Sequence, residues 1–317
     1  MRVLGVLAVS GLVLAGCGGA TSSDDNAAGA GPTIVATTTM LGDVASQVAS
    51  CAGGSASTLM PVGADPHDFA PSSEQVAELV EADLVVANGL GLEQGLSAPL
   101  DAARDDGATV LEVADLVDPL EFDGHAEDGH AGEEHAGEEH GSYDPHVWHD
   151  AARMAGVAEI VGDTLAESTG DQAFTACGQQ VRDSLLETDE QVRTILEVVP
   201  DDQRVLVTDH DAFEYFAQAY GFEIAGVVIP GGSTLAEPSS DELADLVEVI
   251  QSTGVPAIVT DVAEPDALAD AVAAEVGDDV ALVELYVGSL GPSGSGADTY
   301  AGMMVTNAQR IADALAG

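Results

Sequence analysis

The sequence contains no lysine, so its cationic side chains are seven arginines, set against 56 aspartates and glutamates. The formal net charge is −49 at pH 7. Nucleic-acid binding requires a basic surface that contacts phosphates, and this balance excludes DNA and RNA as partners. The same charge disfavours docking on anionic lipid, so attachment to a membrane must come from another feature.

Long apolar runs are also scarce. The run from Val3 to Leu14 follows Arg2 and is too short for a stable transmembrane helix. It leads into Leu-Ala-Gly-Cys17, so residues 1–17 resemble a bacterial lipoprotein signal rather than an ordinary signal peptide. The resemblance implies cleavage before Cys17 and lipidation of its thiol, which would anchor the protein outside the cytoplasm. Residues 18–32, rich in Gly, Ser, Ala and Asp, predict a flexible tether.

Cysteine is rare as well. Only Cys51 and Cys177 remain after Cys17. Outside the cytoplasm an even pair is more often bridged than free, and two thiols allow a single connectivity. We therefore expect a disulfide between them, with two buried thiols as the alternative.

What the sequence does have is three short stretches that each place a histidine beside carboxylates, with an aromatic residue shortly after. They are 63–69 around His67, 144–148 around His146 and 208–213 around His210. In the first two stretches a proline directly precedes the histidine, and it stiffens the turn before any ligand arrives. Three neutral imidazoles brought together by folding form a site for a borderline divalent metal, zinc first. Three unrelated surface histidines are the alternative, against which the repeated pattern argues.

From residue 33 onward, short apolar runs alternate with amphipathic stretches. The strands expected from these runs are 34–38, 57–60, 84–87, 110–113, 205–208, 224–229, 257–260 and 280–287. This rhythm predicts an α/β fold with parallel sheets and helices on both faces. Ser72 is expected to cap one of the helices.

The chain is long enough for two domains. The apolar spacing predicts a helix over 172–198, about 40 Å long at 1.5 Å per residue, which could tie two lobes together. We expect a first lobe over 33–170, a linking helix over 171–199 and a second lobe over 200–317. Ligands in open α/β sheets bind beyond the carboxyl ends of strands, where His210 lies, so the metal should occupy the cleft between the lobes.

The rhythm breaks at 118–145, where histidines recur every five residues among Glu, Asp and Gly. They are His125, His130, His135 and His140. The tract has too few apolar side chains to form a core, so we expect it to lack fixed structure without metal. A five-residue step does not align side chains on one helix face, which favours weak capture of several metal ions. A solvated acidic loop is the alternative.

These motifs resemble a known family, the metal-binding lipoproteins of zinc and manganese ABC importers. The resemblance covers 33–317 in order and rests on segments 63–69, 88–93, 144–148, 209–213 and 233–239, with Thr299, Tyr300 and Asn307. It implies two Rossmann-like lobes joined by one long backbone helix, with His67, His146 and His210 as metal ligands. It also implies a membrane permease and an ATPase as partners. A histidine- and acid-rich loop is found in zinc-specific members, so it points to zinc. We expect a monomer.

One position departs from the family pattern. Many members read Leu-Tyr-x-Asp-Ser-Leu near the C-terminus, and that aspartate is commonly the fourth ligand, whereas this chain has Gly288 there. Manganese prefers oxygen-rich sites and three imidazoles suit zinc, so the missing carboxylate makes Mn²⁺ the less favoured cargo. The candidates for the fourth position are water, then Asp261, then Glu284. Glu284 comes last because four residues of strand, about 13 Å, separate it from position 288.

The expected function is therefore capture of Zn²⁺ outside the cytoplasm and delivery to an ABC permease, without catalysis. A manganese-binding member of the same family is one alternative. A surface zinc-dependent hydrolase is another, since three histidines and an open fourth position also describe a catalytic zinc. However, the sequence has no His-Glu-x-x-His and nominates no general base. A surface adhesin is a third possibility, with no basic or aromatic patch to support it.

Overall fold

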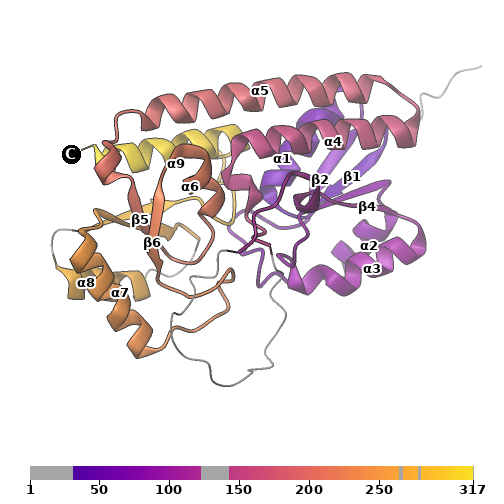
Figure 1. The fold of residues 1–317 in the computed structure, drawn as a ribbon. Helices are drawn as coiled ribbons and strands as arrows, with labels where there is room; N and C mark the ends of the chain where they lie inside the picture. Colours follow the sequence, from indigo (N-terminus) through magenta and orange to yellow (C-terminus); the bar gives the residue numbers. More distant parts are fainter. Residues whose placement is uncertain (1–30, 123–142, 264–266, 278–279, 317) are drawn as a thin grey trace, which may run out of the picture. The chain divides into compact units, whose positions relative to one another are not determined.

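Two four-stranded parallel sheets, one in each half of the chain, form the framework of the protein (Figure 1). The computed structural model describes residues 31–122, 143–263, 267–277 and 280–316. The first sheet has the order β2 (Ser55–Thr58), β1 (Thr33–Ala36), β3 (Leu84–Ala87), β4 (Thr109–Glu112). The second has the order β6 (Glu223–Val227), β5 (Val205–Thr208), β7 (Ala257–Asp261), β8 (Ala281–Leu285). The two orders are equivalent, and the two-lobed α/β fold expected from the sequence is confirmed.

The helices of the first lobe are α1 (Thr39–Cys51), α2 (Ser73–Glu81) and α3 (Ser97–Asp106). The predicted cap at Ser72 is confirmed: its side chain accepts from the Gln75 N–H while the Gln75 side chain accepts from the Ser72 N–H. The sequence did not predict α3. Its buried apolar residues are only Leu100 and Ala103, too few for a clear helical period.

A pair of long helices follows, α4 (Ala151–Thr169) and α5 (Ala173–Leu196). Helix α5 has 24 residues and packs against α4, against α1 of the first lobe and against the C-terminal helix α9 (Tyr300–Leu315), so it links the lobes (Figure 1). It is slightly shorter than predicted, because the chain leaves the helix in a turn before Pro200. Cys51 and Cys177 form a disulfide that ties α1 to α5.

The second lobe contains α6 (Glu214–Tyr220), α7 (Ser240–Thr253) and α8 (Ala267–Val276) around its sheet. Four short 3₁₀ helices complete the elements of the described residues: η1 (Gln94–Leu96), η2 (Ala114–Leu116), η3 (Val147–His149) and η4 (Asp201–Gln203). One large apolar cluster joins inner residues of both lobes to α1, α4, α5 and α9. Smaller clusters lie under α2 and α3 and under α7 and α8. Burial of these faces drives the sheets and helices together.

Aromatic side chains connect the lobes beside the strand ends. The Trp148 indole N–H donates to the carbonyl oxygen of Val287 at 2.8 Å, and the Tyr300 hydroxyl donates to the carbonyl oxygen of Trp148 at 2.8 Å. Trp148 and Tyr300 are almost completely buried. Their hydrogen-bonding groups are therefore satisfied within the protein, which holds the turn that follows His146 against the second lobe.

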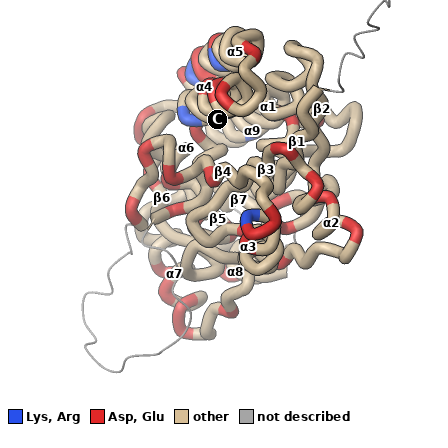
Figure 2. Tube along the Cα trace, turned by 90° about the vertical axis from the view of Figure 1, so that its right-hand side faces the viewer, with Lys and Arg blue, Asp and Glu red and all other residues tan. Residues whose placement is uncertain are grey.

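Acidic residues are spread over both lobes, whereas arginines are few and α4 and α5 carry several of them (Figure 2). Four guanidinium groups lie over aromatic rings of the second lobe: Arg153 over Tyr215, Arg193 over Tyr220, Arg204 over Phe222 and Arg310 over Tyr286. These cations contribute to packing and hydrogen bonding within the protein.

Several sequence predictions lie outside the described residues. They are the signal segment 1–17 with Cys17, nearly all of the tether 18–32, and the loop histidines His125, His130, His135 and His140. Within the part of the chain that the structure describes, no helix is both long and apolar enough to cross a bilayer.

Candidate metal centre

His67 lies in the turn between β2 and α2 and is 4% exposed. Its backbone N–H donates to Asp65 Oδ1 at 2.9 Å, across the intervening Pro66. This side chain-to-backbone bond closes a rigid turn, since proline has already restricted φ. The Thr234 hydroxyl of the second lobe donates to the other oxygen of Asp65. The His67 turn is therefore held from both lobes.

His146 is fully buried and repeats the same turn. Its backbone N–H donates to Asp144 Oδ1 at 2.9 Å, and its ring Nδ1 lies 2.7 Å from the same oxygen. The Asn88 side chain donates to the carbonyl oxygen of Pro145 at 2.9 Å, and the Tyr215 hydroxyl donates to that of Asp144 at 2.7 Å. With Nδ1 engaged by a carboxylate, Nε2 is the nitrogen left to bind a ligand.

His210 comes from the second lobe, two residues beyond β5, and is 3% exposed. The Thr208 hydroxyl donates to the His210 carbonyl oxygen at 2.8 Å and closes the turn. Ring Nδ1 lies 3.2 Å from Asp209 Oδ2. Nδ1 and Nε2 are both buried, and neither has a partner with hydrogen-bond geometry among the described residues. A buried imidazole nitrogen in that state is available to a cation.

The structure brings these three histidines together. The Nε2 atoms of His67 and His146 are 3.2 Å apart, and the centroid distances among the three rings are 5.3, 5.6 and 5.2 Å. One ligand atom from each lies within 4.8 Å of the others, and no further group of this kind is found among the described residues. Two nitrogens bound tetrahedrally at about 2.05 Å from one zinc ion would be roughly 3.4 Å apart. The observed separation fits such an ion.

Burial controls the charges of His146 and Asp144. It lowers the pKa of His146 well below the usual value, with the positive charge of His210 acting in the same direction. Burial also raises the pKa of Asp144 to about 7. His146 is therefore a neutral imidazole at pH 7, the form in which nitrogen can ligate a metal.

The environment of His210 differs. Burial lowers its pKa, but the surrounding carboxylates outweigh that effect and leave the pKa above the usual value; they belong to Asp209, Asp261 and Asp65. Carboxylates from both lobes thus give the surroundings of His210 a negative electrostatic potential. Such a field favours a divalent cation in the site.

The two carboxylates proposed for the fourth position differ in burial and in hydrogen bonding. Asp261 is 5% exposed at the end of β7, and its Oδ2 accepts from the Gly288 N–H at 3.0 Å. Glu284 is exposed on β8 and is absent from the ligand group. Strand β8 ends at Leu285, so the four residues of continuous strand expected between Glu284 and position 288 are not present. Asp261 is likewise absent from the ligand group.

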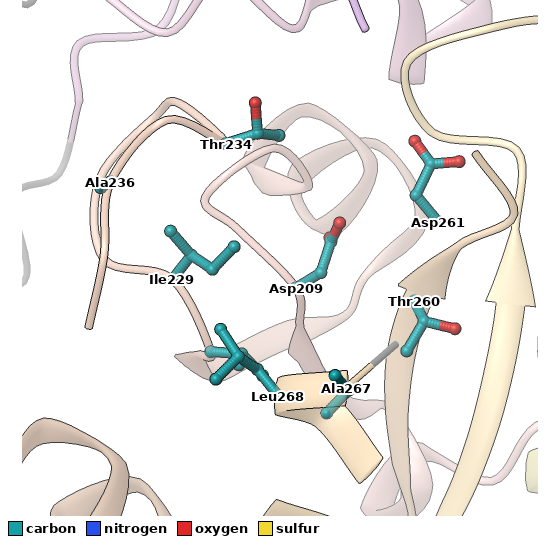
Figure 3. Close-up of a pocket in the computed structure, with 10 residues that line it drawn as sticks. Asp209, Ile229, Thr234, Ala236, Thr260, Asp261, Ala267 and Leu268 are labelled. Atoms are coloured by element: carbon teal, nitrogen blue, oxygen red, sulfur yellow. The ribbon is translucent and has the colours of Figure 1, made fainter. Parts of the chain in front are cut away.

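A cavity of about 280 Å³ lies beside the His210 turn in the second lobe. Its polar lining consists of Asp209, Thr234, Thr260 and Asp261, and the rest is mainly apolar. Figure 3 shows the carboxylates of Asp209 and Asp261 pointing toward the same end of this cavity. Water can therefore reach the carboxylate side of the cluster.

Two further buried ionisable side chains were not singled out from the sequence. His149 is 1% exposed and stacks on Phe213 with ring centroids 4.5 Å apart, but it lies outside the ligand group. Glu93 is 5% exposed and accepts hydrogen bonds from Thr37 and from the backbone of Asn88. The sequence marks segment 88–93 only as part of a family motif. The signal that could have identified Glu93 is its position as an acid in an otherwise apolar and glycine-rich segment.

Two α/β lobes that converge on a buried cluster of metal-ligand side chains define a solute-binding protein for metal ions. Residues 34–314 match the model of the family described as ZnuA, zinc-uptake complex component A, periplasmic. The chain belongs to this family of periplasmic metal-binding proteins of ABC importers. Its members are solute-binding components that work with a permease and an ATPase, and they are not enzymes.

Similar proteins carry the names of two metals. The zinc-binding protein TroA of Treponema pallidum is 32% identical over 311 residues, covering 96% of this chain and 95% of its own. The manganese-binding lipoprotein MntA of Halalkalibacterium halodurans is 28% identical over 315 residues, covering 98% and 97%. The solved structure of the Treponema pallidum protein matches with a TM-score of 0.76 at 30% identity, over 90% of this chain and 99% of that one.

Proposed function

We propose that this protein captures Zn²⁺ outside the cytoplasm and delivers it to the permease of an ABC importer. His67, His146 and His210 would be the protein ligands. The observation that supports zinc is the donor set: three buried imidazoles gather within 4.8 Å, and no carboxylate of a described residue belongs to the group. Nitrogen donors suit zinc, whereas manganese prefers oxygen.

Preorganisation supports the same function. Each of the first-lobe histidines is fixed by an aspartate that accepts its N–H at 2.9 Å, so little conformational freedom remains to be lost on binding. Acidic carboxylates behind His146 and His210 orient the rings and make the imidazoles stronger donors. The site is built before the cation arrives.

Manganese is the second candidate cargo. The carboxylates that act on His210 could supply oxygen donors, and a relative covering nearly the whole chain is named for manganese. Titration of metal-free protein with each ion separates the two. We expect one tight zinc equivalent and much weaker binding of manganese; manganese binding as tight as zinc binding would reject the zinc proposal.

The ligand set is tested by His146→Ala. Removing one of three donors should weaken zinc binding by at least about 100-fold, equivalent to roughly 2.7 kcal/mol. His149→Leu is the matched control, because His149 is a neighbouring and equally buried histidine outside the cluster. Calorimetry should show near-normal zinc affinity in the control. Near-normal affinity in His146→Ala would disprove the shared site.

Zinc affinity should also fall with acidity. Each imidazole must be neutral to ligate. Burial holds the pKa of His146 well below its usual value, so this ring stays neutral, whereas the carboxylates around His210 raise the pKa of that ring. Protonation of His210 should therefore weaken zinc binding as pH falls. Titrations between pH 8 and pH 5.5 provide the measurement, and an affinity that stays the same across that range would contradict His210 as a ligand.

Two sequence features extend the proposal. Lipidation of Cys17 would attach the protein to the cell membrane, and Cys17→Ala should abolish its partitioning into a detergent phase.

The histidines from His125 to His140 would collect ions weakly. Deleting that stretch should remove the weak zinc equivalents and leave the tight one; loss of the tight equivalent would contradict this role.

A further inference from the structure

Gly288 lies between the His67 turn and the Asp261 carboxylate. A Cβ atom placed on it would lie 3.0 Å from Pro66 Cδ, closer than nearly all real Cβ contacts, and 3.6 Å from Asp261 Oδ2. Pro66 is the residue that fixes the His67 turn. Residue 288 therefore connects the turn that carries His67 with Asp261.

Asp261 is fixed in place at the end of β7. Strands β5 and β7 are neighbours, with Thr208 paired to Val259, so the chain that runs from Thr208 to His210 leaves the sheet next to the end of β7, where Asp261 lies. The chain changes direction across the sheet between these strands, which is where open α/β sheets bind their ligands. Asp261 Oδ1 accepts from the Ala263 N–H and Oδ2 accepts from the Gly288 N–H, each at 3.0 Å.

Among the three carboxylates that act on His210, Asp261 is the one without another role. Asp65 accepts from the His67 N–H and the Thr234 hydroxyl. Asp209 lies against Nδ1 of His210 and so orients that ring. The Asp261 oxygens accept one backbone N–H each, and a carboxylate oxygen has a second lone pair to offer.

Asp261 does not belong to the group of ligand atoms that lie within 4.8 Å of one another. Its carboxylate is close enough to act on His210, yet it is held back from the imidazole nitrogens by its two backbone bonds. Because Asp261 also lines the cavity beside the His210 turn, a water molecule can lie between the cation and the carboxylate. Zinc with three protein ligands commonly takes a water in the fourth position.

We infer that Asp261 accepts a hydrogen bond from the water that completes the coordination of the bound cation, and that the cavity lined by Asp209 and Asp261 supplies this water. The inference rests on the proposed function. It makes Asp261 a positioning residue that strengthens binding through the water. Groups that hold metal-bound ligands in this way typically contribute 10- to 100-fold in metal affinity.

Calorimetric titration of the metal-free full chain with zinc tests this. Asp261→Asn should weaken binding about 10- to 100-fold. Glu284→Gln is the matched control, because it removes one negative charge from an exposed carboxylate on the adjacent strand β8, and it should change affinity by less than about 3-fold. Equal affinities of Asp261→Asn and the wild-type protein would overturn the inference.

Cobalt(II) absorption distinguishes a bridging water from a direct bond. The band pattern of Asp261→Asn should equal that of the wild-type protein, since the inner ligands are unchanged; an altered pattern would make Asp261 a direct ligand and overturn the inference. Unchanged thermal unfolding of the metal-free variants would exclude a structural cause. Failure of the wild-type protein itself to bind zinc tightly would instead reject the proposed function.

Discussion

The aspartate two positions before each first-lobe histidine performs the same task in two separate turns. Asp65 and Asp144 each accept the histidine N–H at 2.9 Å, with a proline between. Such bonds are local, and the residues that form them are adjacent in sequence. The orientation of His67 and His146 is therefore encoded within a few residues of each.

Glu93 illustrates a buried acid outside the metal centre. Its carboxylate accepts from the Thr37 hydroxyl at 2.6 Å, the Asn88 N–H at 2.8 Å and the Gly89 N–H at 3.1 Å. Burial raises its pKa, although these hydrogen bonds act in the opposite direction. The folded protein therefore holds the proton of Glu93 to a higher pH than the unfolded chain does.

This predicts the sign of a pH effect. Between the unfolded pKa of about 4.5 and the raised folded pKa, the native state binds more protons, so the Glu93 contribution to stability decreases as pH rises. Glu93→Gln removes this dependence. Urea unfolding at pH 4.5 and pH 7.5 should show the wild-type stability falling relative to that of the variant, by at most about 1.4 kcal/mol for each pH unit between the two pKa values. Parallel pH profiles would contradict the prediction.

At the scale of elements, α4 and α5 approach closely because glycines face each other. A Cβ on Gly178 would lie 2.8 Å from the Ala158 carbonyl oxygen, and one on Gly162 would lie 2.6 Å from that of Phe174. Real Cβ atoms do not tolerate such contacts with backbone. The close packing of the linking helix therefore depends on these two positions.

Gly178→Ala should destabilise the protein by about 1–3 kcal/mol, because the helices must separate to admit the methyl group. Gly156→Ala is the control in the same helix pair. Its Cβ would meet Val117 at 3.5 Å, an ordinary contact, so the gain in helix propensity should leave it neutral or stabilise it by about 0.5–1 kcal/mol. Denaturant unfolding compares the two, and equal stabilities of both variants would refute this packing argument.

For the whole molecule, the disulfide between Cys51 and Cys177 closes a loop of sequence separation 126 and joins α1 to the linking helix. Restricting so long a loop reduces the entropy of the unfolded chain. Replacing both cysteines by serine should cost about 2–5 kcal/mol and lower Tm. Reduction of the wild-type protein should produce the same loss. An unchanged Tm after complete reduction would show that the bridge contributes little.

Much of the architecture was predictable because it depends on local pattern. Strands β3 and β5 begin and end where the apolar runs do, and the capped start of α2 follows from its first residues. Helix α3 was not predictable, because its few apolar contacts belong to a small cluster that exists only after folding. The metal site likewise has features set by local sequence and features that exist only after folding.

The sequence alone determined which side chains could ligate a metal, since the repeated turns around His67, His146 and His210 are formed by neighbouring residues. Only the tertiary structure decided that their nitrogens meet, because that depends on the register of β5 in one lobe and on turns in the other. It also placed Asp261 against Gly288 and left Glu284 exposed. The expected separation of Glu284 from position 288 assumed continuous strand, whereas β8 ends at Leu285.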